Sequence, residues 1–358
     1  MKYTFEIVEL NKDTWYRIEN TIDSNIFVSE QWCNYLHTIG YTPLVITVSN
    51  DDGLIGYFIG TKKKIVFFTL VMAPADGTGT YTQGLVILQQ VYEDERVIIY
   101  QKLVKWLFQK HICVLFQVDD WQLRRDQEKW TSIWHQPTLD AHGLKYTYRE
   151  TLYVNLHKTE EELWAGLQYK SAKYSVNKAR KLGLYVREIT DRSQIDEFVA
   201  VHYNQLVEVC QNKNGQFPKV SQQPSRMKAV CEALFPNRIM MLEVLGKDEN
   251  GLEQIMSSGI YCYDKGESIY WTGASYKRYQ KYCPNELMVW EAMRMLSQRG
   301  AGDLNFGGMA HYKLKFGTIY AYVPRLIIAK YAWLIGVKSC AKKMYLRFKD
   351  VRIFYKQK

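Results

Sequence analysis

The stretch that decides the fold is residues 268–317, SIYWTGASYKRYQKYCPNELMVWEAMRMLSQRGAGDLNFGGMAHYKLKFG. An aromatic strand over Ser268–Ala274 leads through a basic, tyrosine-rich loop into a predicted helix over Glu286–Arg299. A short strand over Asp303–Phe306 follows and ends in a pair of glycines. Paired glycines let a backbone turn sharply or approach a ligand closely. The stretch therefore predicts a strand–helix–strand unit that closes in a tight turn.

Two lysines follow this turn closely. Gly307 and Gly308 precede Lys313 and Lys315 by only a few residues. Lysines beside such a turn can hold an anion or stabilise negative charge that develops during a reaction. A surface turn with solvated lysines has the same pattern, so these residues by themselves leave both interpretations open.

The chain as a whole shows the same order of elements twice. Each half contains helices, a three-strand antiparallel meander, a long amphipathic helix and one further strand. The predicted meanders cover Leu44–Val48, Leu54–Gly60, Lys64–Pro74, and then Ile239–Leu245, Gln254–Tyr263, Ser268–Ala274. We expect an α+β fold with mixed sheets and flanking helices, built by duplication of one unit, with domains at 1–147 and 148–324.

The composition suits a cytoplasmic globular protein. The start, MKYTFEIVEL, has no apolar run of the signal-peptide type, and the longest apolar stretches, Ile65–Ala75 and Leu326–Val337, are too short or interrupted to cross a bilayer. The seven cysteines are odd in number and lack Cys-x-x-Cys spacing. They are expected to be reduced thiols, with neither a disulfide framework nor a zinc site.

Positive charge gathers in the last segment, residues 325–358. It holds ten Lys or Arg and one acid, Asp350, and so carries +9 of the formal total of +10. A basic amphipathic segment can lie on an anionic membrane surface, which would place the protein on the inner face of the membrane. It can also contact tRNA phosphates, or pack on the domain as a helix with a charged outer face.

A second basic region follows a capping box at Thr159–Glu162. On a helix, Lys170, Lys173, Lys178 and Lys181 share one broad side. By itself, this pattern is typical of a solvated helix face. The glycine-rich segment Ala75–Gln83 lacks a Walker lysine and is interpreted as a loop.

Several motifs, taken in order, resemble the Fem aminoacyltransferase superfamily. They are Phe27–Trp32, Thr159–Trp164, Lys170…Lys173…Asn177-Lys178-Ala179…Gly183, Tyr270…Gly273-Ala274, Pro284–Leu287, Trp290–Ala292, Gly300, Asn305–Gly308 and Lys313…Phe316-Gly317. The resemblance implies two tandem domains of the GNAT (acyl-CoA N-acyltransferase) fold, with the active site in residues 148–324.

The chain departs from that family's pattern in three places. Asn305 stands where the family usually has an acid, and Lys173 stands where an arginine is common, which keeps the charge without bidentate phosphate geometry. The coiled-coil arm of some peptidoglycan-modifying members has no counterpart.

The resemblance implies transfer of an acyl group to an amine of a cell-envelope sugar or peptide precursor, which can be lipid- or nucleotide-linked. Direct attack needs a positioned donor, a neutral amine, stabilisation of the oxyanion and a proton for the leaving group, but no covalent intermediate. By its match to the family, Lys313 is the predicted catalytic residue. Tyr270 could relay a proton or orient the acceptor, and Asn305 would position the reactants.

Further site residues follow from the same resemblance. Lys170, Lys173 and Lys178 would hold phosphates of a donor or acceptor. Tyr276, like Tyr270, could relay a proton or orient the acceptor, and Gly307 and Gly308 could bring the backbone close to a ligand. His311 lies two residues before Lys313 but is a lone histidine.

The acyl donor is predicted to be acyl-CoA, ahead of aminoacyl-tRNA. The missing arm argues against the tRNA-using peptidoglycan enzymes, although the usual Arg/Gln-x-x-Gly-x-Gly/Ala loop for the coenzyme A pyrophosphate is also missing. No metal is predicted to take part. The alternative function is a non-catalytic GNAT-fold module that binds anionic membrane or RNA through its basic C-terminus.

Overall fold

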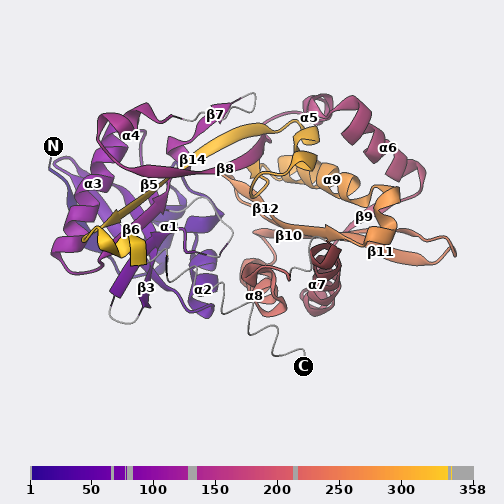
Figure 1. Ribbon diagram of the computed structural model, residues 1–358, viewed down its shortest axis with the longest axis horizontal. Coiled ribbons are helices and arrows are strands. Elements are labelled where there is room, and N and C mark those ends of the chain that lie inside the picture. The colour runs from indigo at the N-terminus through magenta and orange to yellow at the C-terminus, as the bar shows by residue number, and fades with distance from the viewer. Residues whose placement is uncertain are drawn as a thin grey trace.

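A computed structural model shows one long sheet that runs through both halves of the chain, with helices on both faces (Figure 1). The structure describes residues 2–65, 68–76, 78, 84–127, 135–212, 217–337 and 340. Most of the predicted glycine-rich loop and most of the basic tail therefore lie outside the described residues.

Fourteen strands of the described chain belong to this sheet. They are β1 (Thr4–Ile7), β2 (Thr42–Asn50), β3 (Gly53–Ile65), β4 (Phe68–Ala73), β5 (Gly84–Ile87), β6 (Leu115–Asp119), β7 (Arg125–Gln127), β8 (Tyr146–Asn155), β9 (Tyr185–Glu188), β10 (Ile239–Lys247), β11 (Glu253–Cys262), β12 (Ser268–Ser275), β13 (Asp303–Asn305) and β14 (Ile319–Ala329). The order is β1-β2-β3-β4-β6-β14-β8-β13-β12-β11-β10-β9, with β5 beside β3 and β7 beside β14.

The α-helices of the described residues lie between these strands. They are α1 (Lys12–Glu19), α2 (Glu30–Thr38), α3 (Glu93–Gln109), α4 (Pro137–Ala141), α5 (Glu160–Gly166), α6 (Tyr174–Lys181), α7 (Ile195–Asn212), α8 (Pro224–Leu234) and α9 (Pro284–Gln298). Figure 1 shows α9, α5 and α6 over one face of the second half's strands and α7 and α8 over the other.

The two halves share one topology, as the sequence predicted. In each, an antiparallel meander ends in a strand that pairs in parallel with the strand after a long helix. In the first half β4 pairs with β6 across α3, and in the second half β12 pairs with β13 across α9. The prediction of an α+β fold with two related units is confirmed.

Strands β8 and β14 join the halves at the centre of the sheet. β14 pairs antiparallel with β8 on one side and with β6 on the other. Residues 325–329, where the predicted basic tail begins, are the last part of β14. Leu326 packs into the core of the first half, while Ile327 faces the core between the halves. Such alternation is typical of a strand buried on both faces.

The segment Trp121–Gly143, between β6 and β8, consists of short elements. It contains a 3-10 turn at Trp121–Leu123, the strand β7 and the short helix α4, while residues 128–134 lie outside the described chain. β7 pairs with β14 over three residues. A three-residue strand carries too little alternation to be recognised in a sequence.

Helix starts were easier to predict, because capping depends on neighbouring residues. The Ser29 side chain accepts a hydrogen bond from the Trp32 amide at the start of α2. Thr159 and Glu162 form the reciprocal capping box of α5. Helix α5 leads into the basic segment, and α2 packs at the interface between the halves.

Candidate functional site

The parallel strands β12 and β13 part soon after they meet. Ser268 pairs with Leu304 and Ile269 with Asn305, and no further pair follows. The chain then turns toward β8, where the Phe306 amide donates to the Leu152 carbonyl at 2.8 Å. Beyond Ile269, the β12 edge that faced β13 has no further strand partner in the described chain. An open strand edge can hydrogen-bond an extended ligand.

The glycine turn lies where the strands part. Gly307 and Gly308 have φ angles of 70° and 120°, which side chains rarely adopt. The Gly307 amide donates to Asn305 Oδ1 at 2.8 Å, and the Gly308 amide donates to Thr151 Oγ1 at 3.1 Å. The Thr151 hydroxyl donates in turn to Asn305 Oδ1 at 2.6 Å. Asn305 is fully buried and anchors the turn.

Lys313 lies at the same turn. It belongs to a 3-10 segment, His311–Phe316, and its Nζ donates to the carbonyls of Phe306 at 2.5 Å and Gly308 at 3.1 Å. The ammonium thus holds the carbonyls of the turn, while Asn305 and Thr151 hold its amides. His311 is exposed at the start of this segment.

Tyr270 is buried on the other side of the gap. Its ring stacks on Tyr261 with centroids 4.9 Å apart and meets Phe306 edge-on at 6.0 Å. Burial, together with neighbouring Tyr312, raises the pKa of Tyr270 well above its ordinary value. The hydroxyl is therefore uncharged at neutral pH and is suited to donate a hydrogen bond, not to accept a proton as a base.

Tyr276 lies at the far end of β12 and not at the turn. It is half-buried, and the Arg278 guanidinium lies 4.5 Å from its ring centre. The next residues, Lys277–Tyr282, form a 3-10 segment that leads into α9. Tyr276 thus borders the N-terminus of a long helix, whose free amides favour anions.

The basic helix packs beside the lysine segment. It begins with a π-helical turn at Tyr169–Lys173 and continues as α6. The Gln168 amide donates to the Lys315 carbonyl at 2.9 Å, which joins the two basic segments. The predicted helix is present, although its irregular first turn was not foreseen.

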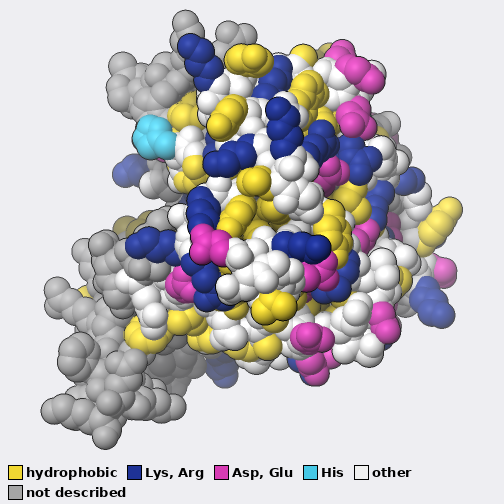
Figure 2. Space-filling view, turned by 90° about the vertical axis from the view of Figure 1, so that its right-hand side faces the viewer, with side chains coloured by type: hydrophobic (Ala, Val, Ile, Leu, Met, Phe, Trp, Pro, Cys, Tyr) yellow, Lys and Arg dark blue, Asp and Glu magenta, His cyan; other side chains and the backbone are white. Residues whose placement is uncertain are grey.

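The lysines of this helix face outward. Ala172, Val176 and Ala179 are buried, which leaves Lys170 exposed and Lys178 half-buried on other sides of the helix. Lys173 makes a contact within the protein, since its Nζ donates to the Ala165 carbonyl at 3.1 Å. Figure 2 shows many Lys and Arg side chains on the end of the molecule where α6 lies.

The corresponding place in the first half is filled. β4 and β6 pair over four positions, up to Ala73 and Val118. A Cβ on Gly84 would lie 3.0 Å from Val118, 3.1 Å from the Tyr100 hydroxyl and 3.8 Å from Ala73. The backbone at Gly84 therefore closes the end of the β4–β6 strand pair. In the second half, the corresponding strands β12 and β13 part and leave a gap.

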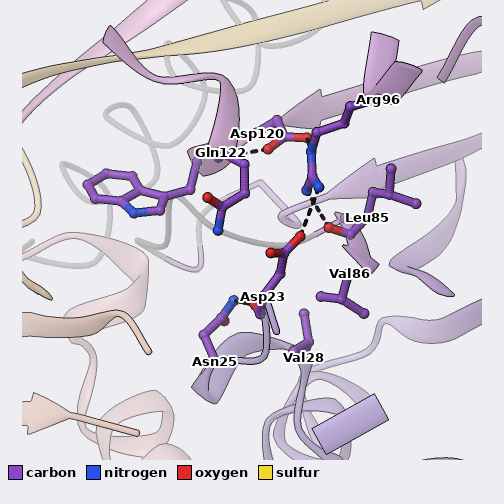
Figure 3. A pocket seen from close by; sticks show the side chains of 10 residues that line it. Asp23, Asn25, Val28, Leu85, Val86, Arg96, Asp120 and Gln122 are labelled. Atoms are coloured by element: carbon purple, nitrogen blue, oxygen red, sulfur yellow. Dashed lines mark hydrogen bonds and ion pairs between the residues drawn. The ribbon is translucent and has the colours of Figure 1, made fainter. Parts of the chain in front are cut away.

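A buried charge cluster completes that closure (Figure 3). The Arg96 guanidinium contacts Asp120 at 2.6 Å and Asp23 at 2.8 Å, and donates to the Leu85 carbonyl at 2.5 Å. The adjoining cavity, of about 10 Å³, has room for about one water molecule. We interpret this cluster as structural.

A larger cavity, of about 50 Å³, lies between the halves. Its lining residues are Tyr35, Ile39, Tyr41, Asp76, Thr78, Val220, Ser221 and Arg226. Tyr41 donates to the Asp76 carbonyl at 2.7 Å, and Arg226 donates to the Ile39 carbonyl at 3.3 Å. Sequence reasoning missed this site, because its two sides are far apart in the chain and carry no motif.

A buried polar network also escaped prediction. His202 Nδ1 lies 2.7 Å from Ser258 Oγ, and its Nε2 lies 3.3 Å from Thr272 Oγ1. Burial lowers the pKa of His202 to about 3, so the ring is neutral. Gln222 donates to the same Thr272 hydroxyl and neighbours the cavity residues Val220 and Ser221.

The described residues hold no group of three or more His, Cys, Asp or Glu side chains arranged to bind a metal. Within the same residues, no helix combines the length and apolar character needed to cross a membrane.

Comparison with protein families gives one match. Residues 168–314 match the model of the acetyltransferase (GNAT) domain. This region, less than half of the chain, contains the parting strands, the glycine turn and the basic helix. No curated protein matches the chain.

Solved structures resemble the chain over most of its length. FemX aligns with a TM-score of 0.66 and 13% identity, over 89% of this chain and 96% of FemX. A tandem GNAT protein from the clavulanic acid biosynthesis pathway aligns at TM-score 0.49 and 10% identity, over 92% and 99% of the two chains. L-PGS from Bacillus licheniformis aligns at TM-score 0.49 and 11% identity, over 89% and 91%.

The FemX similarity confirms the predicted Fem-like fold with two related units, and the match to the GNAT domain lies in the second unit. The domain boundaries, the roles of the site residues and the substrates remain predictions.

Proposed function

We propose, from the tandem GNAT-type fold and the gap between β12 and β13, that this chain transfers an acyl group to an amine. The observation that carries the proposal is the early parting of these strands beside a fixed glycine turn. An open strand edge can align a donor that contains amide groups, and the turn marks one end of that edge.

The proposed chemistry is direct attack by the amine. Tyr270 is a buried, neutral hydroxyl that can donate to a leaving sulfur or oxygen. The Lys313 ammonium adds positive charge near the developing oxyanion. Asn305 keeps the turn in place, consistent with its predicted positioning role.

The donor is proposed to be acyl-CoA, with aminoacyl-tRNA next. Each carries phosphates that the outward lysines Lys170 and Lys178 could bind, beside the segment that contains Lys313. The exposed rings of Tyr169 and Tyr174 lie among these lysines. The basic tail remains a proposed contact with anionic lipid, although residues 341–358 lie outside the described chain.

The acceptor is proposed to be an amine of an envelope precursor, bound in the cavity between the halves. This cavity brings together a carboxylate, Asp76, a guanidinium, Arg226, and two tyrosines. Opposite charges in one cavity suit an acceptor that carries both an amine and an acidic group. At about 50 Å³ it would admit only a small part of such a molecule unless the halves move apart.

A thermal-shift screen followed by a transfer assay tests the proposal. Coenzyme A, acetyl-CoA, aminoacyl-tRNA and UDP-sugars are added separately, and the ligand that raises the melting temperature is assayed for acyl transfer. A ligand at a hundred times its Kd stabilises the folded state by about 2.7 kcal/mol, which corresponds to several degrees.

The double variant Lys170→Ala/Lys178→Ala should lose most of the donor-induced shift. The matched control Lys158→Ala, at another exposed lysine, should keep it. Absence of any shift and of any turnover with all four ligands would contradict the proposal and favour the non-catalytic alternative.

A further inference from the structure

Glu267 is a buried acid that no predicted role uses. It precedes β12 directly and is 5% exposed. Its Oε1 accepts a hydrogen bond from Asn305 Nδ2 at 2.7 Å. Its Oε2 is buried and has no hydrogen-bond partner in the described chain. A buried polar atom without a partner is uncommon and calls for a physical explanation.

The hydrogen-bond directions around Asn305 leave no choice of orientation. The Gly307 amide can only donate, so the oxygen of the Asn305 side chain must face it. The Asn305 NH₂ group must then face Glu267, whose Oε1 accepts. A proton on Glu267 would consequently sit on Oε2.

Among the described residues, the two arginines that face Glu267 are each engaged with another acid. Arg124 is engaged with Asp126 at 3.1 Å and lies 3.6 Å from Asp303, and Arg149 binds Asp119 at 2.9 Å. Asp303 adds negative charge from β13. Burial raises the pKa of Glu267 to about 8, against the weaker opposing effects of Asn305, Arg124 and Arg149.

We propose that Glu267 is an uncharged positioning residue for the acyl-transfer site, which holds the Gly307–Gly308 turn in place through Asn305. The proposal rests on the proposed function for its link to transfer. The chain of contacts runs from Glu267 to the Asn305 amide, and from Asn305 to the Gly307 amide and to Thr151. Thr151 then accepts from the Gly308 amide. An aspartate at 305 would lack the donor that Glu267 Oε1 receives.

The protonated acid makes the turn sensitive to alkaline pH. The folded-state pKa of Glu267 is raised above the ordinary value of 4.5, so the folded state binds the proton more tightly than the unfolded state. The stabilisation is complete below about pH 4.5 and is lost as the pH rises through about 8. Ionisation would leave a buried charge without a donor on Oε2.

Two substitutions separate charge from shape. Glu267→Gln keeps the acceptor oxygen and cannot ionise, whereas Glu267→Ala removes the partner of Asn305. Hydrogen–deuterium exchange at pH 7 is measured for the backbone amides of residues 306–310. We expect wild type and Glu267→Gln to exchange alike, and Glu267→Ala to exchange about tenfold faster because the turn loses one anchoring bond.

The pH profile supplies a second readout. Between pH 6 and pH 9, the melting temperature of wild type should fall more than that of Glu267→Gln. Over the same range, the rate of acyl transfer should also fall more for wild type than for Glu267→Gln. If the melting temperatures of these two proteins change in parallel with pH, the proposal that Glu267 is uncharged is wrong. Unchanged exchange at residues 306–310 in a folded Glu267→Ala would overturn the link to the turn.

These outcomes are distinct from a failure of the proposed function. If wild type shows no acyl transfer, the proposed function fails, while exchange and melting still decide whether Glu267 holds the turn. If wild type is active and Glu267→Ala remains folded with full activity, the positioning role fails and the proposed function stands.

Discussion

At the scale of one residue, Lys313 shows that a predicted catalytic group can also make structural contacts. The sequence placed a lysine near a glycine turn, and the structure puts its ammonium on the Phe306 and Gly308 carbonyls of that turn. An ammonium keeps its positive charge when it donates hydrogen bonds to carbonyls. Lys313 can therefore shape the turn and still contribute positive charge to it.

Lys313→Ala should reduce acyl transfer by about 10²–10³-fold, the loss seen when one oxyanion-stabilising donor is removed. The protein should stay folded by circular dichroism, because the lysine is only partly buried. The control is Lys158→Ala, which removes an exposed lysine away from the turn and should retain activity. Full activity of Lys313→Ala would remove this residue from the mechanism.

At the scale of one element, β12 shows why local sequence leaves a site incomplete. Its aromatic composition predicts a strand, but a register shift opposite Ile260 and Tyr261 decides which side each residue faces. As a result Tyr270 lies over Gly273, where an added Cβ would be 1.8 Å from the Tyr270 hydroxyl. The glycine is needed for the position of the tyrosine.

Gly273→Ala should therefore displace the Tyr270 ring and lower the free energy of unfolding by about 1–3 kcal/mol, as for other overpacked cores. Urea denaturation measures this change. In the control Gly166→Ala the added methyl meets no atom within 4 Å, so stability should be unchanged or higher. Equal stability of the two variants would show that the β12 backbone shifts to accept the methyl group.

At the scale of the whole molecule, β8 and β14 join two related units into one sheet. Their junction contains Asp119, a fully buried carboxylate that binds Arg325 at 2.6 and 2.7 Å and Arg149 at 2.9 Å. The three residues come from β6, β14 and β8. Because both halves depend on this junction, we expect them to unfold together.

Asp119→Ala should lower the free energy of unfolding by about 3–5 kcal/mol, since it leaves two arginines without their buried partner. Circular dichroism and tryptophan fluorescence should report one shared transition that moves to lower temperature. Asp196→Ala, which removes an exposed ion pair with Lys228, should cost less than about 1 kcal/mol. Two separate transitions, with one unaffected by Asp119→Ala, would contradict the joint unfolding.

The sequence by itself determined most of the elements and their order. Capping at Ser29 and Thr159, the meanders and the helix before β13 depend on neighbouring residues, so they could be predicted from local patterns. The repeated order predicted two related units, and the Fem-like motifs predicted the half that holds the glycine turn.

Only the tertiary structure decided which residues meet. The bonds from Glu267 to Asn305 and from Thr151 to Gly308 join residues 38 and 157 positions apart. The cavity between the halves and the partners of Asp119 likewise combine distant segments. Periodicity and capping report neighbours along the chain, whereas burial and hydrogen bonding at this site depend on strand register and on the packing of the two halves.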